Sequence, residues 1–175
     1  LPTRAGLGFC ALLLILLVGS INYNLGLGFG LTFVAGACAI VDMVQTTRNL
    51  AGLVLDTGRA SAVFAGEDAP FELRVDNPTR LARFAVWIDF EHVAEPRQAI
   101  DVAAGTSSAL VLRTPTQARG WMRPPRVRLS TRFPLGLFHA WSWWQPDARA
   151  LVYPFPEQDA PPLPMLGRPS PDGTG

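Results

Sequence analysis

Two histidines, His92 and His139, carry the side chains of this chain that most often serve as general bases or metal ligands. They are 47 positions apart, and neither has a second His, Cys or carboxylate at the spacing of a metal site. Glu91 is next to His92, but adjacent side chains on a regular strand point to opposite faces. The hydroxyl pairs lack the sharp turn that exposes a catalytic nucleophile: Ser107 with Ser108, and Ser130 with Thr131. We therefore predict no catalytic residue, no cofactor and no metal site.

An arginine-rich segment is the one cluster in the sequence whose side chains could bind an anion. Its five arginines surround Trp121 and precede Phe133: Arg119, Arg123, Arg126, Arg128 and Arg132. On a regular strand the last three would share one face, where solvated guanidiniums explain them without a ligand. Contact with lipid headgroups, with a further segment of the protein, or with a protein partner stays open. The net charge is only +1, so we expect no nucleic-acid partner, and no small-molecule substrate is evident.

The aromatic residues near position 140 are expected to anchor packing. Strand alternation places Trp141 and Trp143 on one face and Trp144 on the other. Core packing explains them, and an interface or membrane-surface patch stays open as the alternative. The preceding segment, residues 133–138, reads Phe-Pro-Leu-Gly-Leu-Phe and predicts a turn that begins at proline.

Two uncharged apolar runs, residues 5–21 and 25–41, must position the rest of the chain. Each has about 17 residues, near the lower limit for an α-helix that crosses about 30 Å of hydrocarbon. Only three residues separate them, which predicts a two-helix transmembrane hairpin over residues 5–44 in the lipid bilayer. The alternatives are a cleaved signal peptide after Arg4, a signal peptide followed by one membrane anchor, and a hairpin buried in a soluble core. The second run argues against the cleaved signal peptide, and the small size of the chain argues against the buried hairpin.

The flanks of these runs predict an orientation. Arg4 precedes the first run, Arg48 follows the second, and the turn between them is uncharged, so the positive-inside rule places both ends in the cytoplasm. Asp42 is expected as a solvated carboxylate at the membrane interface, or as the partner of Arg48. Gly26 and Gly30 lie on one face of the second run, and Gly28 and Gly36 add further small positions. They are expected to permit close helix packing, against the first run or between two copies of the chain.

The two cysteines lie within the apolar runs. Cys10 and Cys38 are expected to act as small apolar side chains rather than as a disulfide or metal site.

After residue 50 the apolar pattern changes from helical to alternating. Phe71, Leu73 and Val75 alternate with charged residues, as expected for strands with one buried face. The pattern predicts strands near residues 53–57, 69–76, 84–90, 98–102, 108–113, 119–131, 136–142 and 148–153. We therefore expect an all-β, immunoglobulin-like antiparallel β-sandwich over residues 51–154. Residues 155–175 are proline-rich and predict a linker to a missing C-terminal module.

Several segments resemble a known family. They are residues 119–121 (Arg-Gly-Trp), 124–141 with the Arg-Phe-Pro-Leu-Gly-Leu-Phe block, 151–154 (Leu-Val-Tyr-Pro), 21–24, 48–53 and 63–67. Together they resemble the N-terminal part of the bacterial domain-of-unknown-function fifty-eight family. The resemblance implies a membrane protein. Members of this family look like partners of MoxR-type AAA+ ATPases, so the resemblance also implies such an ATPase as a partner. In family members, the β-domain is followed by a further segment that is often related to von Willebrand factor A modules. A metal-dependent adhesion site would lie in that segment, so no residue of such a site is carried over to this chain.

These observations lead to two hypotheses about function. We expect a membrane-anchored, non-enzymatic interaction or scaffold protein, multi-pass in the bacterial inner (plasma) membrane, with its β-domain in the cytoplasm. The alternative is an envelope-facing adhesion or surface-remodelling protein, with the β-domain on the other side of the membrane.

Overall fold

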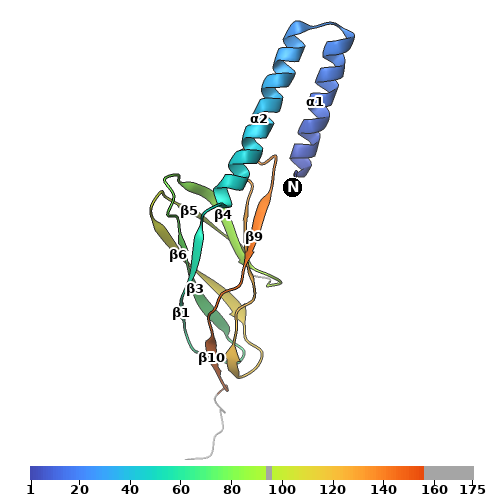
Figure 1. Cartoon of the computed structure of the whole chain (residues 1–175). Helices are drawn as coiled ribbons and strands as arrows, with labels where there is room; N and C mark the ends of the chain where they lie inside the picture. The colour runs from blue at the N-terminus through green and yellow to red at the C-terminus, as the bar shows by residue number, and fades with distance from the viewer. Residues whose placement is uncertain (94–95, 156–175) are drawn as a thin grey trace, which may run out of the picture.

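The computed structural model describes residues 1–93 and 96–155, and consists of a helical hairpin joined to a region of strands (Figure 1). Helix α1 (Arg4–Asn22) and helix α2 (Gly26–Leu50) lie side by side, and their connecting turn is at the end far from the strands. At 1.5 Å per residue they measure about 28 and 37 Å. Both are long and apolar enough to cross a membrane, by length and composition.

The longer helix, α2, extends from the hairpin onto the strands. Its final turns pack against three strands, β4 (Arg83–Phe90), β8 (Val127–Thr131) and β9 (Ala140–Trp144). The strands from Val54 to Tyr153 are called the β region below.

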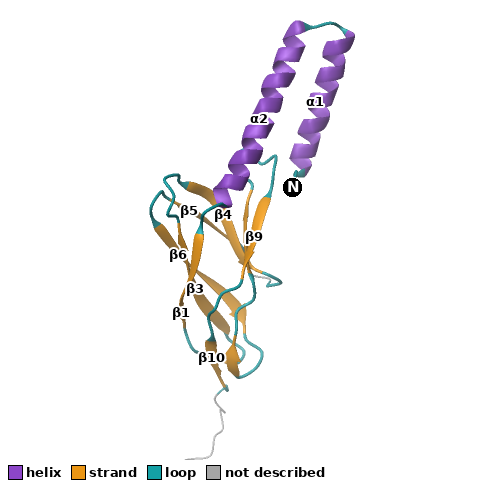
Figure 2. Ribbon diagram, in the orientation of Figure 1, coloured by secondary structure: helices purple, strands orange, loops and turns teal. Residues whose placement is uncertain are grey.

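The β region contains three sheets (Figure 2). One has the order β1-β3-β6, with strands Val54–Ala60, Asp68–Asp76 and Ser107–Pro115. The second has the order β5-β4-β8-β9, where β5 is Gln98–Val102. Both are antiparallel throughout. In the third, β10 (Ala150–Tyr153) pairs in parallel with β2 (Val63–Phe64) and antiparallel with β7 (Gly120–Met122).

The apolar core lies where the first two sheets contribute their buried faces. Phe71, Leu73 and Val75 of β3 are buried, so the predicted alternation of this strand is confirmed. Val86, Ile88 and Phe90 of β4 are buried in the same cluster, together with residues of β6 and β8. The rings of Phe71 and Phe90 meet edge to face, with 6.1 Å between their centroids. Burial of one such side chain contributes about 1.5–3 kcal/mol.

Two predicted strands are wrong. The strand expected over residues 119–131 is interrupted at Pro124 and Pro125, and its halves, β7 and β8, lie in different sheets. Proline has no N–H for a sheet ladder, which explains the break. The strand expected over residues 136–142 begins only at Ala140, because the backbone before it bonds to the start of the chain. The two-residue strand β2 was not predicted, and residues 156–175 of the expected linker lie outside the described residues.

The glycines of α2 confirm only part of the packing prediction. A Cβ at Gly28 would lie 2.2 Å from the Oγ of Ser20, so α1 approaches α2 at this position. A Cβ at Gly26 or Gly30 would meet no atom within 4 Å. The expected close packing against α1 is therefore found at Gly28 but not at Gly26 or Gly30, and association between copies stays a prediction.

Candidate functional site

Polar side chains join the helices to the β region at a site that we call the junction. It has three parts. The end of α2 bonds to β4, the middle of α2 bonds to the loop of residues 132–139 between β8 and β9, and the start of α1 bonds to the same loop. We call this loop the junction loop.

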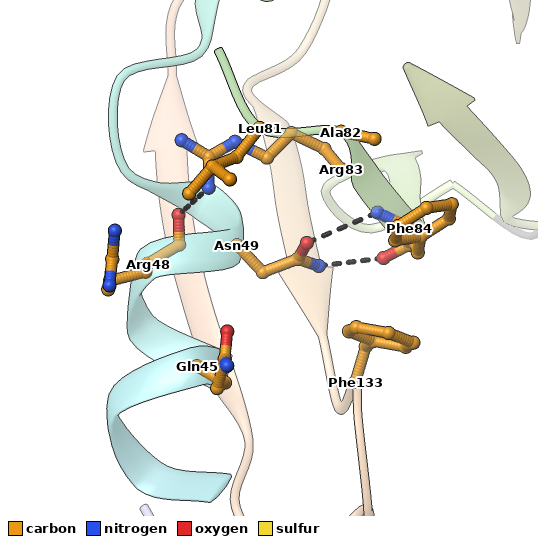
Figure 3. A pocket seen from close by; sticks show the side chains of 8 residues that line it. All are labelled: Gln45, Arg48, Asn49, Leu81, Ala82, Arg83, Phe84 and Phe133. Carbon is orange, nitrogen blue, oxygen red and sulfur yellow. Dashed lines mark hydrogen bonds between the residues drawn. The ribbon is translucent and has the colours of Figure 1, made fainter. Parts of the chain in front are cut away.

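Asn49 attaches the last turn of α2 to β4 (Figure 3). Its Nδ2 donates to the carbonyl oxygen of Phe84 at 2.7 Å, and its Oδ1 accepts from the N–H of Phe84 at 3.1 Å. Nδ2 also donates to Oγ1 of Thr131 on β8, at 2.9 Å. The amide thus pairs with Phe84 as the backbone of a neighbouring strand would, and the Asn49 side chain is buried.

A break in the β4–β5 ladder explains why Phe84 is free to bond to a helix. The register shifts between Arg83 and Val86, and Ala85 has a positive φ of 48°. The Ala85 N–H donates to Oδ1 of Asp101 at 2.7 Å, and its carbonyl accepts from Thr131 Oγ1 at 3.1 Å. Side chains therefore replace the ladder bonds that this β-bulge removes.

Arg83 caps the carboxyl end of α2. Its guanidinium donates to the carbonyl oxygen of Ala51 at 2.8 Å and to that of Arg48. The last carbonyls of a helix lack intrahelical partners and carry partial negative charge, so a cation is favourable there. Burial, and then the charge of Arg48, lower the pKa of Arg83. A hollow of about 230 Å³ lies beside these bonds and is lined also by Phe133, whose ring centroid is 5.3 Å from that of Phe84.

Asp42 lies in a different environment from the one predicted. Instead of being solvated or paired with Arg48, it is 1% exposed, and its Oδ1 accepts the backbone N–H of Leu135 at 2.8 Å. The junction loop folds back onto α2 and covers the carboxylate. Among the described residues, Oδ2 of Asp42 has no hydrogen-bond partner. The carboxylate therefore holds the loop to α2.

The start of α1 holds the other side of the junction loop. The N–H of Thr3 donates to the carbonyl oxygen of Leu137 at 2.9 Å, and Thr3 Oγ1 donates to that of Gly136 at 2.7 Å. Oγ1 also accepts from the N–H of Gly6 at 3.1 Å, which caps the helix. A Cβ at Gly6 would lie 2.1 Å from the Leu137 oxygen, so only glycine permits this approach.

The residues that the sequence singled out for acid–base chemistry do not converge. His92 follows the outer end of β4 and is exposed, whereas His139 belongs to the junction loop at the hairpin end of the β region. Burial, and then Arg132, lower the pKa of His139. Within residues 1–93 and 96–155, no three His, Cys, Asp or Glu side chains form a group that could hold a metal. Cys10 and Cys38 are both free thiols.

The arginine-rich segment is divided by the fold. Arg128 pairs with Asp89, with 3.3 Å between Nε and Oδ1, and its guanidinium lies 5.9 Å from the ring centroid of Trp143. Arg119 and Arg123 flank β7 in another sheet, and Arg132 opens the junction loop. The three arginines that were predicted to share a face, Arg126, Arg128 and Arg132, all follow the proline break, and only Arg128 lies within β8.

The tryptophans of β9 divide between core and surface. Trp144 packs against the core, while Trp141 and Trp143 are exposed on the other face of the four-stranded sheet. Because both indoles are exposed, they remain available for the interface or membrane-surface patch that the sequence left open.

Comparison with protein-family models gives no match for this chain, and comparison with curated proteins gives none either. The resemblance to the domain-of-unknown-function fifty-eight family therefore stays a prediction.

We did not predict a site role for three residues of the junction: Thr3, Asn49 and Arg83. Each bonds to backbone atoms at least 32 positions away in the chain, whereas helix and strand patterns report on near neighbours. The one local hint is an asparagine beside apolar Leu50 at a helix end.

Proposed function

We propose that this chain is a membrane-anchored, non-enzymatic scaffold whose hairpin holds the β region in one orientation at the membrane surface. The observation that carries the proposal is the junction. Asn49, Arg83, Asp42 and Thr3 join both helices to the β region by side-chain hydrogen bonds. A flexible tether would not need these bonds.

The apolar helices support membrane anchoring. Their large side chains are mostly exposed, including Leu14, Ile15, Leu27, Phe33 and Val34. A hydrocarbon environment would cover this surface, which water would not favour.

The β region is proposed as an immunoglobulin-like sandwich that presents an interaction surface. Two antiparallel sheets contribute to one apolar cluster, which is the arrangement of such a domain. Non-enzymatic action is inferred because the sequence offers no set of residues with a defensible catalytic geometry.

The proposed location is the bacterial inner (plasma) membrane, crossed twice, with the β region in the cytoplasm. Arg4 opens α1 and Arg48 lies in the last turn of α2, so both positive charges are at the end of the hairpin that carries the β region. The positive-inside rule favours the cytoplasm for that end.

Cysteine labelling tests this location. Thr106, which is exposed, is changed to cysteine in a Cys10→Ala/Cys38→Ala background, and cells with a permeabilised outer membrane receive an impermeant maleimide. Protection until lysis is expected for a cytoplasmic β region. Labelling before lysis would overturn the location, and would favour the envelope-facing adhesion or surface-remodelling alternative.

The proposed partner is a MoxR-type AAA+ ATPase, on the strength of the family resemblance. Crosslinking in native membranes, followed by purification of the full-length protein, should recover such an ATPase. Its absence from repeated crosslinked preparations would count against the scaffold role with this partner.

A further inference from the structure

A hollow on the outer face of the four-stranded sheet is bordered by aromatic and cationic side chains. Trp87 of β4, Ser130 of β8 and Trp141 of β9 lie in one cross-strand row. The serine side chain is short, so the surface is hollowed next to it, with a volume of about 240 Å³. Arg97 and His139 also line this hollow. The guanidinium of Arg97 lies 5.4 Å from the Trp87 ring centroid, and the ring of His139 lies 5.4 Å from that of Trp141.

A second hollow adjoins the first at Arg132 and His139, which line both. It has a volume of about 440 Å³ and reaches Arg4 at the start of α1. We call the two hollows together the cationic pocket.

The charges of the cationic pocket are not neutralised by the described carboxylates. Across residues 1–93 and 96–155, no Asp or Glu forms an ion pair with Arg4, Arg97 or Arg132. By contrast, Arg128, which is next to the pocket on β8, is paired with Asp89. Burial and then Arg132 lower the pKa of His139, which agrees with an excess of positive charge. Arg97 and Arg132 line the first hollow, and Arg4 and Arg132 line the second. Guanidiniums without an acidic partner are suited to a phosphate group.

The position of the pocket selects the source of that phosphate. Arg4 is the first residue of α1, so it lies at the depth where a membrane-spanning helix enters the headgroup layer. Trp87 lines the first hollow, and the ring of Trp141 lies against that of His139, so both indoles can stack against the less polar parts of a headgroup. Arginine and tryptophan side chains together are typical of membrane-interface contacts.

We propose that the cationic pocket binds the phosphate group of an anionic lipid headgroup. The inference rests on the proposed membrane anchoring and goes further, because it assigns a lipid class and a site to the surface of the β region. Free inorganic phosphate has the same chemistry and is the other source to be tested.

Lipid retention tests the proposal. The full chain is reconstituted in vesicles of equal parts phosphatidylcholine and phosphatidylglycerol, extracted in mild detergent and purified. The two lipids that remain bound are quantified by mass spectrometry. The wild-type protein should retain phosphatidylglycerol above its share in the vesicles. Each of Arg97→Gln and Arg132→Gln should lower this enrichment by about fivefold. The matched control, Arg119→Gln/Arg123→Gln, removes two arginines near β7 and should leave the enrichment unchanged.

Three results would overturn the proposal. They are no enrichment in the wild-type protein, an equal loss in the control, and enrichment that persists in the Arg97→Gln/Arg132→Gln double variant. Arg97 lies outside the strands and is exposed, so Arg97→Gln serves as the test if the double variant does not fold. Quenching of tryptophan emission by inorganic phosphate in lipid-free detergent, without enrichment of phosphatidylglycerol, would assign the pocket to free phosphate instead.

Flotation with vesicles of phosphatidylcholine alone separates this inference from membrane anchoring. If the protein floats but shows no lipid preference, the pocket proposal fails and anchoring stands. If it does not float, anchoring fails as well.

Discussion

The core and the junction are both ordered, but different forces hold them. In the core, Phe71, Val86 and Ile88 are almost fully buried and make apolar contacts between sheets. In the junction, Asn49, Arg83 and Asp42 are also buried, yet each is held by hydrogen bonds to backbone atoms of a distant segment. Apolar burial is non-directional, whereas hydrogen bonds require fixed geometry. We therefore expect the core to provide most of the stability and the junction to fix the orientation of the hairpin.

The largest effect is expected from the core. Phe71→Ala removes a buried ring that contacts Phe90, so the free energy of unfolding of the β region should fall by about 3–5 kcal/mol. Chemical denaturation followed by circular dichroism measures this loss. Val111→Ala, on the exposed face of β6, is the control and should cost less than about 1 kcal/mol. Equal losses in both variants would contradict the division between core and surface.

A smaller effect, confined to the junction, is expected for Asn49→Leu. The substitution leaves the N–H and carbonyl of Phe84 without their partner, and because both bonds are only partly buried, we expect a total cost of about 1–3 kcal/mol. Hydrogen exchange should accelerate at the Phe84 amide while amides of β3 stay protected. Thr47→Ala changes an exposed hydroxyl that bonds only within α2, and should leave Phe84 protected. Loss of protection throughout the β region would show that the junction also stabilises the core.

Gly6→Ala should separate α1 from the junction loop. The added methyl would overlap the Leu137 oxygen, and accommodating it should cost about 1–3 kcal/mol. Exchange of the Thr3 amide, which bonds to that oxygen, reports the separation. Gly8→Ala places a methyl on the same helix with no atom within 4 Å, and should leave Thr3 protected. Protection that persists in Gly6→Ala would disprove the close approach.

The smallest effect concerns pH. The pKa of His139 is lowered in the folded protein by burial and by Arg132, so the unfolded chain takes up the proton first as the pH falls. The contribution of neutral His139 to the free energy of unfolding is complete above about pH 6.5, the ordinary pKa of histidine. It is lost as the pH falls below that pKa. His139→Gln should reduce the decline between neutral and mildly acidic pH in denaturation experiments. His92→Gln, at an exposed turn, is the control, and an equal reduction there would refute the assignment to His139.

The same contrast explains how much the sequence could predict. The hairpin and the alternating strands β3 and β4 were predicted because each pattern repeats within a few residues. The break at Pro124 and Pro125 was readable from proline chemistry, and our prediction of one long strand did not use it. The Asp42–Leu135 bond joins residues 93 positions apart, and no local pattern reports such a contact. Asp42 was therefore predicted to be solvated at the membrane interface or paired with Arg48, whereas in the structure the junction loop covers it.

The most direct test of the account is the distance distribution between the hairpin turn and the β region in a membrane. Spin labels at Tyr23→Cys and Thr106→Cys, in a Cys10→Ala/Cys38→Ala chain in nanodiscs, are measured by double electron–electron resonance. Both positions are exposed, so the labels should not disturb packing. A single narrow distribution that broadens in Asn49→Leu is the result we predict, because the junction bonds fix one orientation. A broad distribution in the unaltered junction would contradict the account, since the hairpin would then be only a tether.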